Sequence, residues 1–559
     1  MSLVEVISKL PLPLGSTDYK EICKNYYYID KTLLIKELLD ERAAISLFTR
    51  PRRFGKTLNM NMLKTFFEKS AEDTSFYFKD KKIWQQGEKY TQYQGKYPVI
   101  FLSFKDANKY TWAELYPRLI ETIRDEYIRH SELKNSNKIS DPDFYKKIVS
   151  GNADTTDYAM SILRLSQMLR EHYGEHVVLI IDEYDTPIQA GYIHGYYKEV
   201  IQFARDILSS ALKDNYNLAY GILTGILRVA KESIFSGLNN VRVYSVLDRK
   251  FSTHFGFTAA EVAEIARYYE AAEKLDEVRD WYDGYKFGPT EIYNPWSVLN
   301  YFSNDCQPQP YWLQTSSNSI IYEMLDNIQE DTYESLRQVI DGGKVTSLVY
   351  TNVIYPELGD RVENIFSLLL MAGYLKAVKT TLTPFGDTEC ELCIPNRELK
   401  NVYYREIIAH LSQSMSINVA YAITKAMLAK DDKALKAALN KFLREAVSYY
   451  DTLNENYYHG LLLGIAVIFA ENYFIRSNRE SGKGRYDIAL EPKKCTFPGI
   501  IVEVKAKGDS DVALAKLAQS ALQQIEEKQY DAEMKSRGIT KIYKYGIAFH
   551  KKQAEIVTN

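Results

Sequence analysis

The sequence has few cysteines, no long apolar run and no strong excess of charge, and each shortage excludes a class of protein. Its 559 residues include five scattered cysteines, which do not make a disulfide framework and so fit a reducing compartment. No apolar run approaches the ~20 residues of a membrane span. The opening MSLVEVISKLPLPLG is too weakly apolar for a signal peptide and has no small-residue cleavage site. We therefore expect a cytoplasmic protein without membrane attachment.

The charge is almost balanced overall but unevenly placed. A net charge of −3 excludes a polycation. Residues 476–559 nevertheless carry 16 Lys and Arg against 11 Asp and Glu, a net charge of +5, which leaves −8 for the other 475 residues. A basic terminal domain on an acidic body is typical of a polyanion partner. Random scatter of charges is the alternative.

A chain of this length is too long for one core, and its pattern predicts three domains over residues 1–290, 291–430 and 431–559. Strand-like apolar runs recur at 43–48, 98–104, 177–182, 218–225 and 241–247. Separated by helical stretches, they predict a parallel sheet with helices on both faces. The middle domain is predicted to be mostly helical, with a helix-plus-hairpin module after residue 365. The last domain reads helix (459–474), strand, strand, helix, strand.

The stretch TRPRRFGKTLNM at residues 49–60 ends in the second half of a phosphate-binding loop. Such a loop needs a strand that ends abruptly, inward-facing N–H groups, a lysine for the phosphates and a hydroxyl for magnesium. Gly55, Lys56 and Thr57 supply these in order, before a predicted helix. Arg53 adds positive charge beside a would-be triphosphate. Arg50 stands where the usual first glycine falls, so the loop must turn by another geometry.

An acidic pair further along the chain supports the same site. The run VVLIIDEYD is a buried strand that ends in Asp182 and Glu183. In P-loop hydrolases the aspartate holds the magnesium shell and the glutamate orients the attacking water; a solvated acidic turn is the alternative. Thr224 ends a further strand, where it could sense the γ-phosphate. Arg228 is a candidate phosphate contact, although we favour an ordinary surface arginine. Together the motifs predict an ATP site with Thr57 and Asp182 around the magnesium ion.

Several long blocks of the first half resemble the bacterial AAA-ATPase-like family. They are YYYIDKTLLIKELL, LFTRPRRFGKTLNMNMLKTFFE, VVLIIDEYDTPI and LTGILRVAKESIFSGLNN, and the resemblance spans roughly residues 5–290. It implies that Arg50-Pro51-Arg52-Arg53 is the family's own form of the loop. It also implies a P-loop NTPase-type domain that binds ATP. Hydrolysis of the ATP is expected, and simple nucleotide sensing is the alternative.

The second constellation lies in residues 476–507. Asp487 falls near the start of one strand, and Glu503 and Lys505 share a face of the next because alternate residues project to one side. Two converging carboxylates make an oxygen site for Mg²⁺ or Mn²⁺, and the lysine can orient a water or stabilise developing charge. Charge within the apolar run GIIVEVKA is costly unless used; an exposed charged hairpin is the alternative. A basic surround for a nucleic-acid backbone would comprise Arg476, Arg479, Arg485 and Lys507.

The order of these elements, with the blocks YYHGLLLG, SNRESGKGRYDIAL, IIVEVKAK and ALQQIEEKQY, resembles a PD-(D/E)XK nuclease superfamily domain over roughly residues 450–550. The resemblance implies that Asp487, Glu503 and Lys505 form the catalytic set and that Gln524 faces it from the following helix. Glu471 is a candidate supporting acid on the first helix, whereas His459 is interpreted as structural. Tyr486 replaces the proline of the motif's name, at a position that varies in the superfamily.

The two constellations predict an α/β multidomain protein that binds ATP and cleaves DNA with a divalent metal. DNA is preferred over RNA as the nucleic-acid partner. A nucleotide-gated regulator that binds nucleic acid without cleaving it is the alternative, as is a nuclease fold turned to a scaffold role. Identical chains could assemble into a ring, as AAA-type relatives often do, and a monomer is the alternative.

Overall fold

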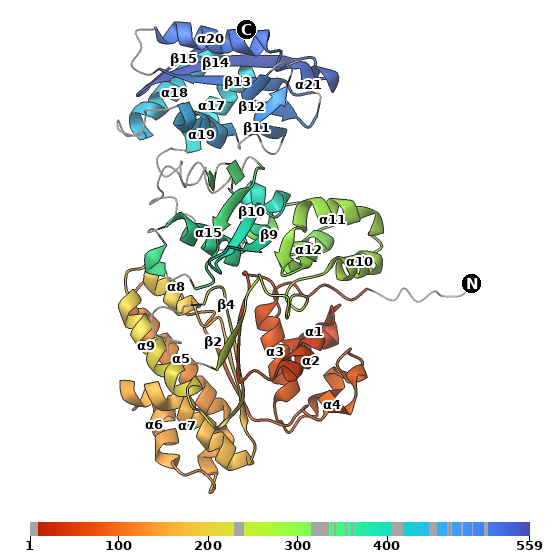
Figure 1. The fold of residues 1–559 in the computed structure, drawn as a ribbon, viewed down its shortest axis with the longest axis vertical. Coiled ribbons are helices and arrows are strands. Elements are labelled where there is room, and N and C mark those ends of the chain that lie inside the picture. Colours follow the sequence, from red (N-terminus) through yellow and green to blue (C-terminus); the bar gives the residue numbers. More distant parts are fainter. Residues whose placement is uncertain are drawn as a thin grey trace, which may run out of the picture. The chain divides into compact units, whose positions relative to one another are not determined.

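The protein is described from a computed structural model, in which two compact units, residues 1–400 (unit 1) and 401–559 (unit 2), are considered separately. The residues that the structure describes are 9–228, 240–314, 335–336, 338–339, 342–352, 355–358, 361–403, 417–446, 455–466, 469, 472–481, 484–494, 496–507 and 513–559. Figure 1 shows the elements of both units. Among these residues, no helix combines the length and apolar character needed to cross a bilayer.

A five-stranded parallel sheet forms the centre of unit 1, in the order β2-β3-β4-β1-β5. The strands are β1 (Ile45–Thr49), β2 (Val99–Ser103), β3 (Val177–Asp182), β4 (Leu218–Gly225) and β5 (Val241–Tyr244). Every residue of β1 and β3 is buried, as expected for strands covered on both faces. All five predicted strands are present, and the α/β class with a parallel sheet is confirmed.

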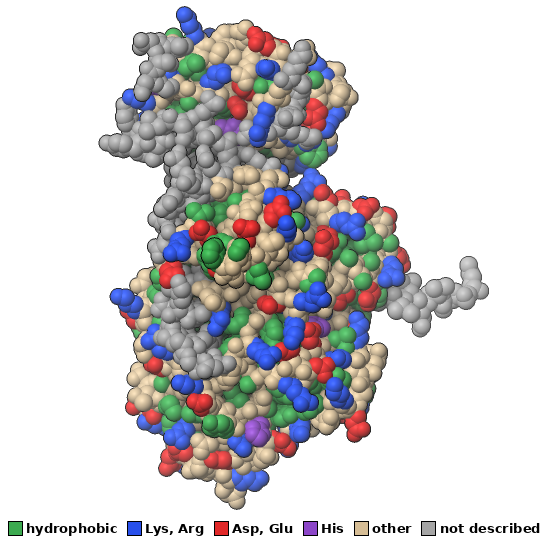
Figure 2. All heavy atoms as spheres, viewed as in Figure 1, with side chains coloured by type: hydrophobic (Ala, Val, Ile, Leu, Met, Phe, Trp, Pro, Cys, Tyr) green, Lys and Arg blue, Asp and Glu red, His purple; other side chains and the backbone are tan. Residues whose placement is uncertain are grey.

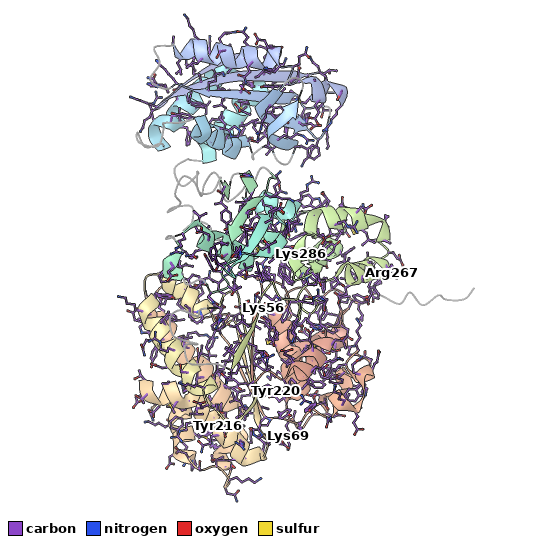
Figure 3. All side chains as sticks on the ribbon, in the orientation of Figure 1. Lys56, Lys69, Tyr216, Tyr220, Arg267 and Lys286 are labelled. Atoms are coloured by element: carbon purple, nitrogen blue, oxygen red, sulfur yellow. The ribbon has the colours of Figure 1, made fainter. Side chains whose placement is uncertain are left out.

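Figure 1 shows α3 on one side of this sheet and α5, α7 and α9 on the other. The helices of this part are α1 (Tyr19–Asn25), α2 (Leu33–Glu41), α3 (Lys56–Phe67), α4 (Glu88–Thr91), α5 (Trp112–Arg129), α6 (Pro142–Ser150), α7 (Thr155–Tyr173), α8 (Thr186–Ile193) and α9 (Tyr197–Leu212), with 3-10 turns at Thr74–Tyr77, Trp84–Gln86 and Ser131–Asn135. Figure 3 places Lys56 toward one end of the sheet and Tyr220 toward the other.

The rest of unit 1 is a helical region that also carries a small antiparallel sheet. Its helices are α10 (Ala259–Tyr268), α11 (Leu275–Tyr282), α12 (Pro295–Ser303) and α15 (Val362–Met371), with 3-10 turns at Ala272–Lys274, Tyr311–Gln314 and Tyr355–Glu357. A hairpin of β6 (Tyr285–Phe287) and β7 (Thr290–Ile292) precedes the sheet β8-β10-β9, which comprises β8 (Val345–Leu348), β9 (Lys376–Leu382) and β10 (Thr388–Cys393). The helix-plus-hairpin module is thus α15 with β9 and β10. On the face in Figure 2, both signs of charge are interspersed over this unit.

Unit 2 is built on a mixed sheet in the order β11-β12-β13-β14-β15, in which only the β13–β14 pair is parallel. Its strands are β11 (Tyr473–Ser481), β12 (Gly484–Pro492), β13 (Gly499–Ala506), β14 (Ile542–His550) and β15 (Gln553–Thr558). Its helices are α17 (Ile417–Ala429), α18 (Asp432–Ala446), α19 (Glu455–Ala466), α20 (Leu514–Glu527) and α21 (Ala532–Ser536). The crossover from β13 to β14 contains α20.

In unit 2 one predicted helix was too long, and two edge strands were not predicted. The helix predicted over 459–474 ends at Ala466, and Tyr473 instead begins β11. The last strand, β15, was not predicted. Both β11 and β15 are edge strands that pair on one side only, so they lack the continuous apolar run by which buried strands are found.

Candidate functional site

The turn between β1 and α3 places the predicted loop residues at the carboxyl end of the parallel sheet. Gly55 adopts a left-handed conformation (φ 77°) immediately before α3, which glycine does without strain. The Thr57 hydroxyl donates to Asp182 Oδ2 over 2.8 Å. The Thr224 hydroxyl donates to the other oxygen, Asp182 Oδ1, over 2.6 Å. Thus residues from α3, β3 and β4 meet at one carboxylate.

Lys56 is buried at the start of α3, where its ammonium group donates to the loop's own carbonyl oxygens. The Nζ atom lies 3.2 Å from Arg50 O and 2.9 Å from Pro51 O. Burial lowers the pKa of the Lys56 amine, while the nearby carboxylate of Glu183 acts in the opposite direction. The two acceptors of the Lys56 ammonium group in the loop are neutral carbonyl oxygens, so they do not cancel its charge. This arrangement suits an anionic ligand.

Glu183 follows the last residue of β3 in a left-handed conformation, with φ of 53°. Its N–H donates to the Thr224 hydroxyl over 3.2 Å. Burial raises the pKa of its carboxyl group, although the Lys56 cation opposes that shift. Non-glycine residues are uncommon at such a φ, and strained conformations of this kind gather at functional sites.

Arg50 does not point into the loop. Its buried guanidinium donates to the carbonyl oxygens of Thr49 (2.9 Å), Tyr244 (2.7 Å) and Phe251 (3.4 Å). The rings of Phe255 and Phe287 flank it, each 5.2 Å from Cζ. Burial lowers the pKa of this guanidinium to about 10. Arg50 therefore links β1, β5 and the segment after β5 through its hydrogen bonds, a role called the Arg50 brace below.

Arg53 borders the loop but its side chain reaches the helical region of unit 1. It adopts φ of 68°, donates to Trp312 O over 3.3 Å and stacks 5.1 Å from the ring of Trp296. Burial lowers the pKa of this guanidinium to about 10. The adjacent Arg52 donates to Gln189 Oε1 over 2.8 Å. The structure thus leaves Arg53 beside the loop, and its contact with phosphate stays a prediction.

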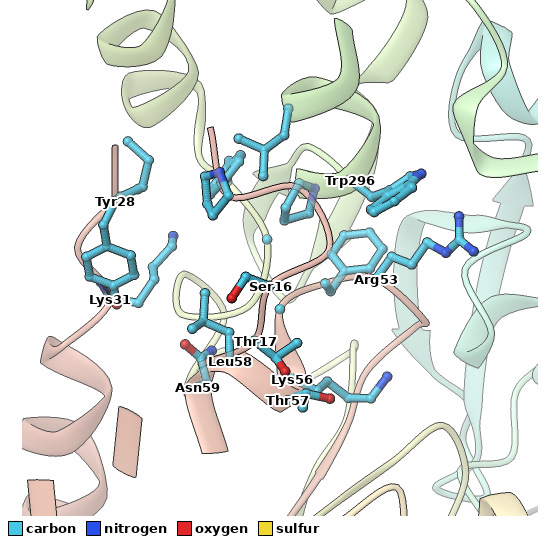
Figure 4. Close-up of a pocket in the computed structure, with 18 of the residues that line it drawn as sticks. Ser16, Thr17, Tyr28, Lys31, Arg53, Lys56, Thr57, Leu58, Asn59 and Trp296 are labelled. Carbon is cyan, nitrogen blue, oxygen red and sulfur yellow. Dashed lines mark hydrogen bonds between the residues drawn. The ribbon is translucent and has the colours of Figure 1, made fainter. Parts of the chain in front are cut away.

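A cavity of about 360 Å³ opens beside the loop. Figure 4 shows Arg53 and Trp296 on one side of it and Tyr28 and Lys31 on the other. Its lining joins the loop residues to a largely apolar wall and comprises, among others, Gly55, Lys56, Thr57, Asn59, Glu183, Pro13, Tyr27, Phe257, Pro295 and Leu299. A pocket with polar groups at one end and an apolar wall at the other suits an amphipathic ligand such as a nucleotide.

Asp185 is a site residue that the sequence interpretation overlooked. Its Oδ2 atom accepts from the N–H groups of Ile226 (2.7 Å) and Leu227 (3.0 Å). A Cβ on Gly225 would lie 2.7 Å from Asp185 Oδ1, so only glycine fits there. Asp185 therefore holds the turn after β4 and, with it, Thr224. The sequence signal for this residue was its place as the second aspartate of DEYD, together with Gly225 directly after Thr224.

The second candidate centre lies in unit 2, where Asp487 on β12 meets Glu503 and Lys505 on β13. The Val504 N–H donates to Asp487 Oδ2 over 2.7 Å, and the Asp487 N–H lies 3.4 Å from Glu503 Oε2. Glu503 is buried and Lys505 is half-buried. The paired strands thus bring the Asp487 carboxylate to the backbone of β13 and the Asp487 backbone N–H to the Glu503 carboxylate, and a joint catalytic role of these residues stays a prediction.

Gln524, on α20, links Glu503 and Lys505 through hydrogen bonds. Its Oε1 atom accepts from Lys505 Nζ over 3.0 Å, while its Nε2 donates to Glu503 Oε1 and to the Tyr530 hydroxyl over 3.2 Å. The bridge needs one acceptor for the lysine and one donor for the carboxylate, and a side-chain amide supplies both. Tyr530 was not predicted, because it lies beyond the motif and only the fold after α20 brings it here.

The donor set fits a hard divalent cation. Asp487 and Glu503 offer carboxylate oxygens from adjacent strands, the ligand type that Mg²⁺ and Mn²⁺ prefer. Within the described ranges, no group of three or more His, Cys, Asp or Glu side chains converges as a metal cage. The candidate acid Glu471 and the side chain of Arg479 lie outside the described residues.

Part of the predicted basic surround is engaged in ion pairs. Arg476 Nε lies 2.7 Å from Glu491 Oε2, and Arg537 pairs with the other oxygen of the same carboxylate. These two cations lower the pKa of Glu491 against the effect of its burial. Arg476 is therefore already paired with Glu491. Arg485 is exposed.

These features define an α/β protein that joins a P-loop-type parallel sheet to a mixed-sheet unit with a carboxylate–lysine centre. Residues 13–235 match the family model described as predicted AAA-ATPase, and residues 453–559 match that of the PD-(D/E)XK nuclease superfamily. Both resemblances are thus confirmed, the first over residues 13–235 and the second over residues 453–559.

One relative is similar over almost the whole chain. It is described as an uncharacterized protein in the vnfD 5′ region of Azotobacter chroococcum mcd 1. The two are 25% identical over 570 residues, which cover 99% of this chain and 98% of the relative. The likeness thus spans both units.

Proposed function

We propose that this protein binds and hydrolyses ATP in unit 1 and cleaves DNA phosphodiesters with a divalent metal ion in unit 2. The two domain families support an ATPase role and a nuclease role. A cytoplasmic location is part of the proposal. So is the division into an ATPase-like domain (1–290), a linking module (291–430) and a nuclease-like domain (431–559).

In unit 1, the N–H groups of the loop around Gly55 and the ammonium group of Lys56 would bind the phosphates. Thr57 and Asp182 would hold Mg²⁺, which neutralises phosphate charge when bound. Thr224 and the Asp185 brace keep the end of β4 against Asp182. The apolar wall of the cavity, with Trp296 and Phe257, would take the sugar and base. Arg53 and Glu183 border the phosphate end.

In unit 2, Asp487 and Glu503 would hold Mg²⁺ or Mn²⁺. The ion, when bound, supplies an activated water and charge stabilisation at the phosphodiester. Lys505, oriented by Gln524, places a cation beside the same centre and can stabilise developing negative charge or hold a water. The observation that carries the proposal is this bridge, because the Gln524 amide ties the lysine and the buried Glu503 into one group.

The test is cleavage of linear and circular DNA by the full chain with Mg²⁺ or Mn²⁺, in the presence and absence of ATP. Lys505→Ala should reduce cleavage at least about 100-fold, since it removes the only cation of the group that Gln524 holds. Lys516→Ala is the matched control, because Lys516 is exposed on α20. Cleavage that survives in Lys505→Ala would contradict the assignment of the centre.

The role of ATP is tested with Lys56→Ala in the same assay. If ATP drives or gates the cut, this variant should lose the effect of ATP and keep any basal cleavage. Lys69→Ala is the control, because Lys69 is exposed and Figure 3 shows it away from Lys56. Binding of DNA without cleavage under every condition would instead favour the nucleotide-gated regulator, and RNA would then be tried as substrate.

A further inference from the structure

His459 is a buried histidine in contact with a residue of the candidate nuclease centre. It lies on α19 and is 2% exposed. Its Nε2 atom is 3.0 Å from the carbonyl oxygen of Asp487 and 3.2 Å from the Ser477 hydroxyl. Ser477 pairs with Ile488 across the β11–β12 ladder, so both partners of the ring belong to the stretch of sheet that presents Asp487.

The carbonyl contact determines which ring nitrogen carries the proton. A carbonyl oxygen only accepts hydrogen bonds, so Nε2 must be the protonated nitrogen. The Ser477 oxygen is then a second acceptor for the same N–H. This arrangement needs a donor at one place on α19, which a purely apolar core residue could not supply.

Asp487 is thereby held at both its side chain and its backbone. Its side chain accepts from the Val504 N–H of β13 over 2.7 Å, and its carbonyl accepts from His459 of α19. The helix is itself fastened at the preceding residue, where the Tyr458 hydroxyl donates to Lys551 O over 2.7 Å and the ring stacks 4.3 Å from Phe549. A rigid turn of α19 therefore stands behind Asp487.

We infer that His459 is a positioning residue for Asp487, which sets the carboxylate of that residue for the metal ion without touching the ion or the substrate. The inference rests on the proposed metal-dependent nuclease. The contacts of residues that orient metal ligands are costly to lose, typically about 10- to 100-fold in metal affinity or activity. His459 acts on the backbone of its ligand, so its loss should weaken metal binding even when the protein stays folded.

The experiment measures Mn²⁺ binding to the full chain without DNA by isothermal titration calorimetry. His459→Leu, which removes the donor, should raise the Mn²⁺ dissociation constant about 10- to 100-fold. His459→Gln, which keeps an N–H donor, should stay within about threefold. Tyr458→Phe is the matched control: it removes a hydrogen bond of the same helix to Lys551 but keeps the ring that stacks on Phe549, so its Mn²⁺ affinity should fall far less than that of His459→Leu. His459→Phe replaces His459→Leu if the latter does not fold.

Asp487→Asn separates the inference from the function on which it rests. If Asp487→Asn loses Mn²⁺ and His459→Leu binds it like the wild type, the positioning role is overturned and the metal site stands. If Asp487→Asn binds Mn²⁺ as tightly as the wild type, the metal site itself is wrong and the inference falls with it. Equal weakening in Tyr458→Phe and His459→Leu would also overturn the inference, because general loosening of α19 would then explain both.

Discussion

At the scale of single residues, the contacts of Arg50 explain how the candidate phosphate loop tolerates an arginine at its first-glycine position. A guanidinium can satisfy several carbonyl oxygens at once, and here it meets those of Thr49, Tyr244 and Phe251. Its charge stays out of the cavity and in the core of unit 1. The departure from the usual loop is therefore a structural substitution and does not by itself argue against nucleotide binding.

Arg50→Gly, which restores the usual loop residue, should destabilise the protein and should not tighten nucleotide binding. Three carbonyl oxygens lose a shared donor and a cavity opens between two aromatic rings, which together cost about 2–5 kcal/mol. Thermal unfolding and titration with a fluorescent ATP analogue check both points. Arg42→Gly is the control, because Arg42 is an exposed arginine with φ of 51°, where glycine is tolerated. Tighter binding without loss of stability in Arg50→Gly would refute the brace.

Glu398 predicts a pH effect within unit 1. This buried carboxylate accepts from the Ser297 hydroxyl and the backbone N–H of Trp312. Burial raises its pKa from 4.5 to about 7. The folded state thus holds the proton longer than the unfolded state. Stability is therefore lost as the pH rises from about 4.5 through 7, by about 3 kcal/mol in all.

Glu398→Gln cannot ionise, so its melting temperature relative to the wild type should rise between pH 5 and pH 8. The comparison of this difference at the two pH values removes the constant effect of replacing a carboxyl by an amide. Glu273→Gln, at an exposed glutamate, should show the same difference at both. A flat difference for Glu398→Gln would show that Glu398 keeps its ordinary pKa.

At the scale of elements, the candidate phosphate loop is packed against the helical region of unit 1. The ring of Phe54 meets Tyr285 at 4.9 Å between centroids, and a Cβ on Gly373 would stand 2.7 Å from Pro51 Cβ. Gly373 follows α15, so the end of that helix supports the loop directly. The loop's shape thus depends on elements that lie more than 200 residues further along the chain.

Gly373→Val should lower the affinity for ATP at least about tenfold, because the new side chain must push Pro51 and the loop aside. Gly386→Val is the matched control. Its φ of 88° is nearly that of Gly373 (86°), but no atom lies within 4 Å of its would-be Cβ. Both variants carry the same backbone strain, and only the first meets the loop. Equal affinities in the two would mean that the contact with Pro51 does not shape the site.

At the scale of the whole molecule, two compact units carry two separate candidate centres. The cavity beside Lys56 is lined by residues of unit 1, and the carboxylate–lysine group is formed within unit 2. Each unit has its own sheet. Ligands of one centre should therefore stabilise mainly the unit that binds them.

Calorimetry of the full chain should resolve two unfolding transitions with different ligand responses. ATP with Mg²⁺ should raise one transition, and Lys56→Ala should abolish that shift. Mn²⁺ alone should raise the other, and Asp487→Asn should abolish it. A single transition that responds to both ligands together would show that the two units unfold cooperatively.

Much of the fold and both candidate centres could be predicted from sequence because their signals are local. A strand buried on both faces is an apolar run, and the loop from Gly55 to Thr57 and the strand that carries Glu503 and Lys505 each lie within a few residues. The edge strands β11 and β15 escaped because pairing on one side leaves no such run. The small sheet of the helical region was only partly foreseen for a similar reason.

By itself, then, the sequence determined the α/β class, the resemblance of two regions to known families and the residues proposed to carry the chemistry. The tertiary structure alone decided where long-range partners lie: Arg50 in the core, Asp185 on the turn after β4, Gln524 between Glu503 and Lys505, and His459 behind Asp487. The physical reason is that a hydrogen bond depends on distance and direction in space, and neither follows from the spacing of residues along the chain.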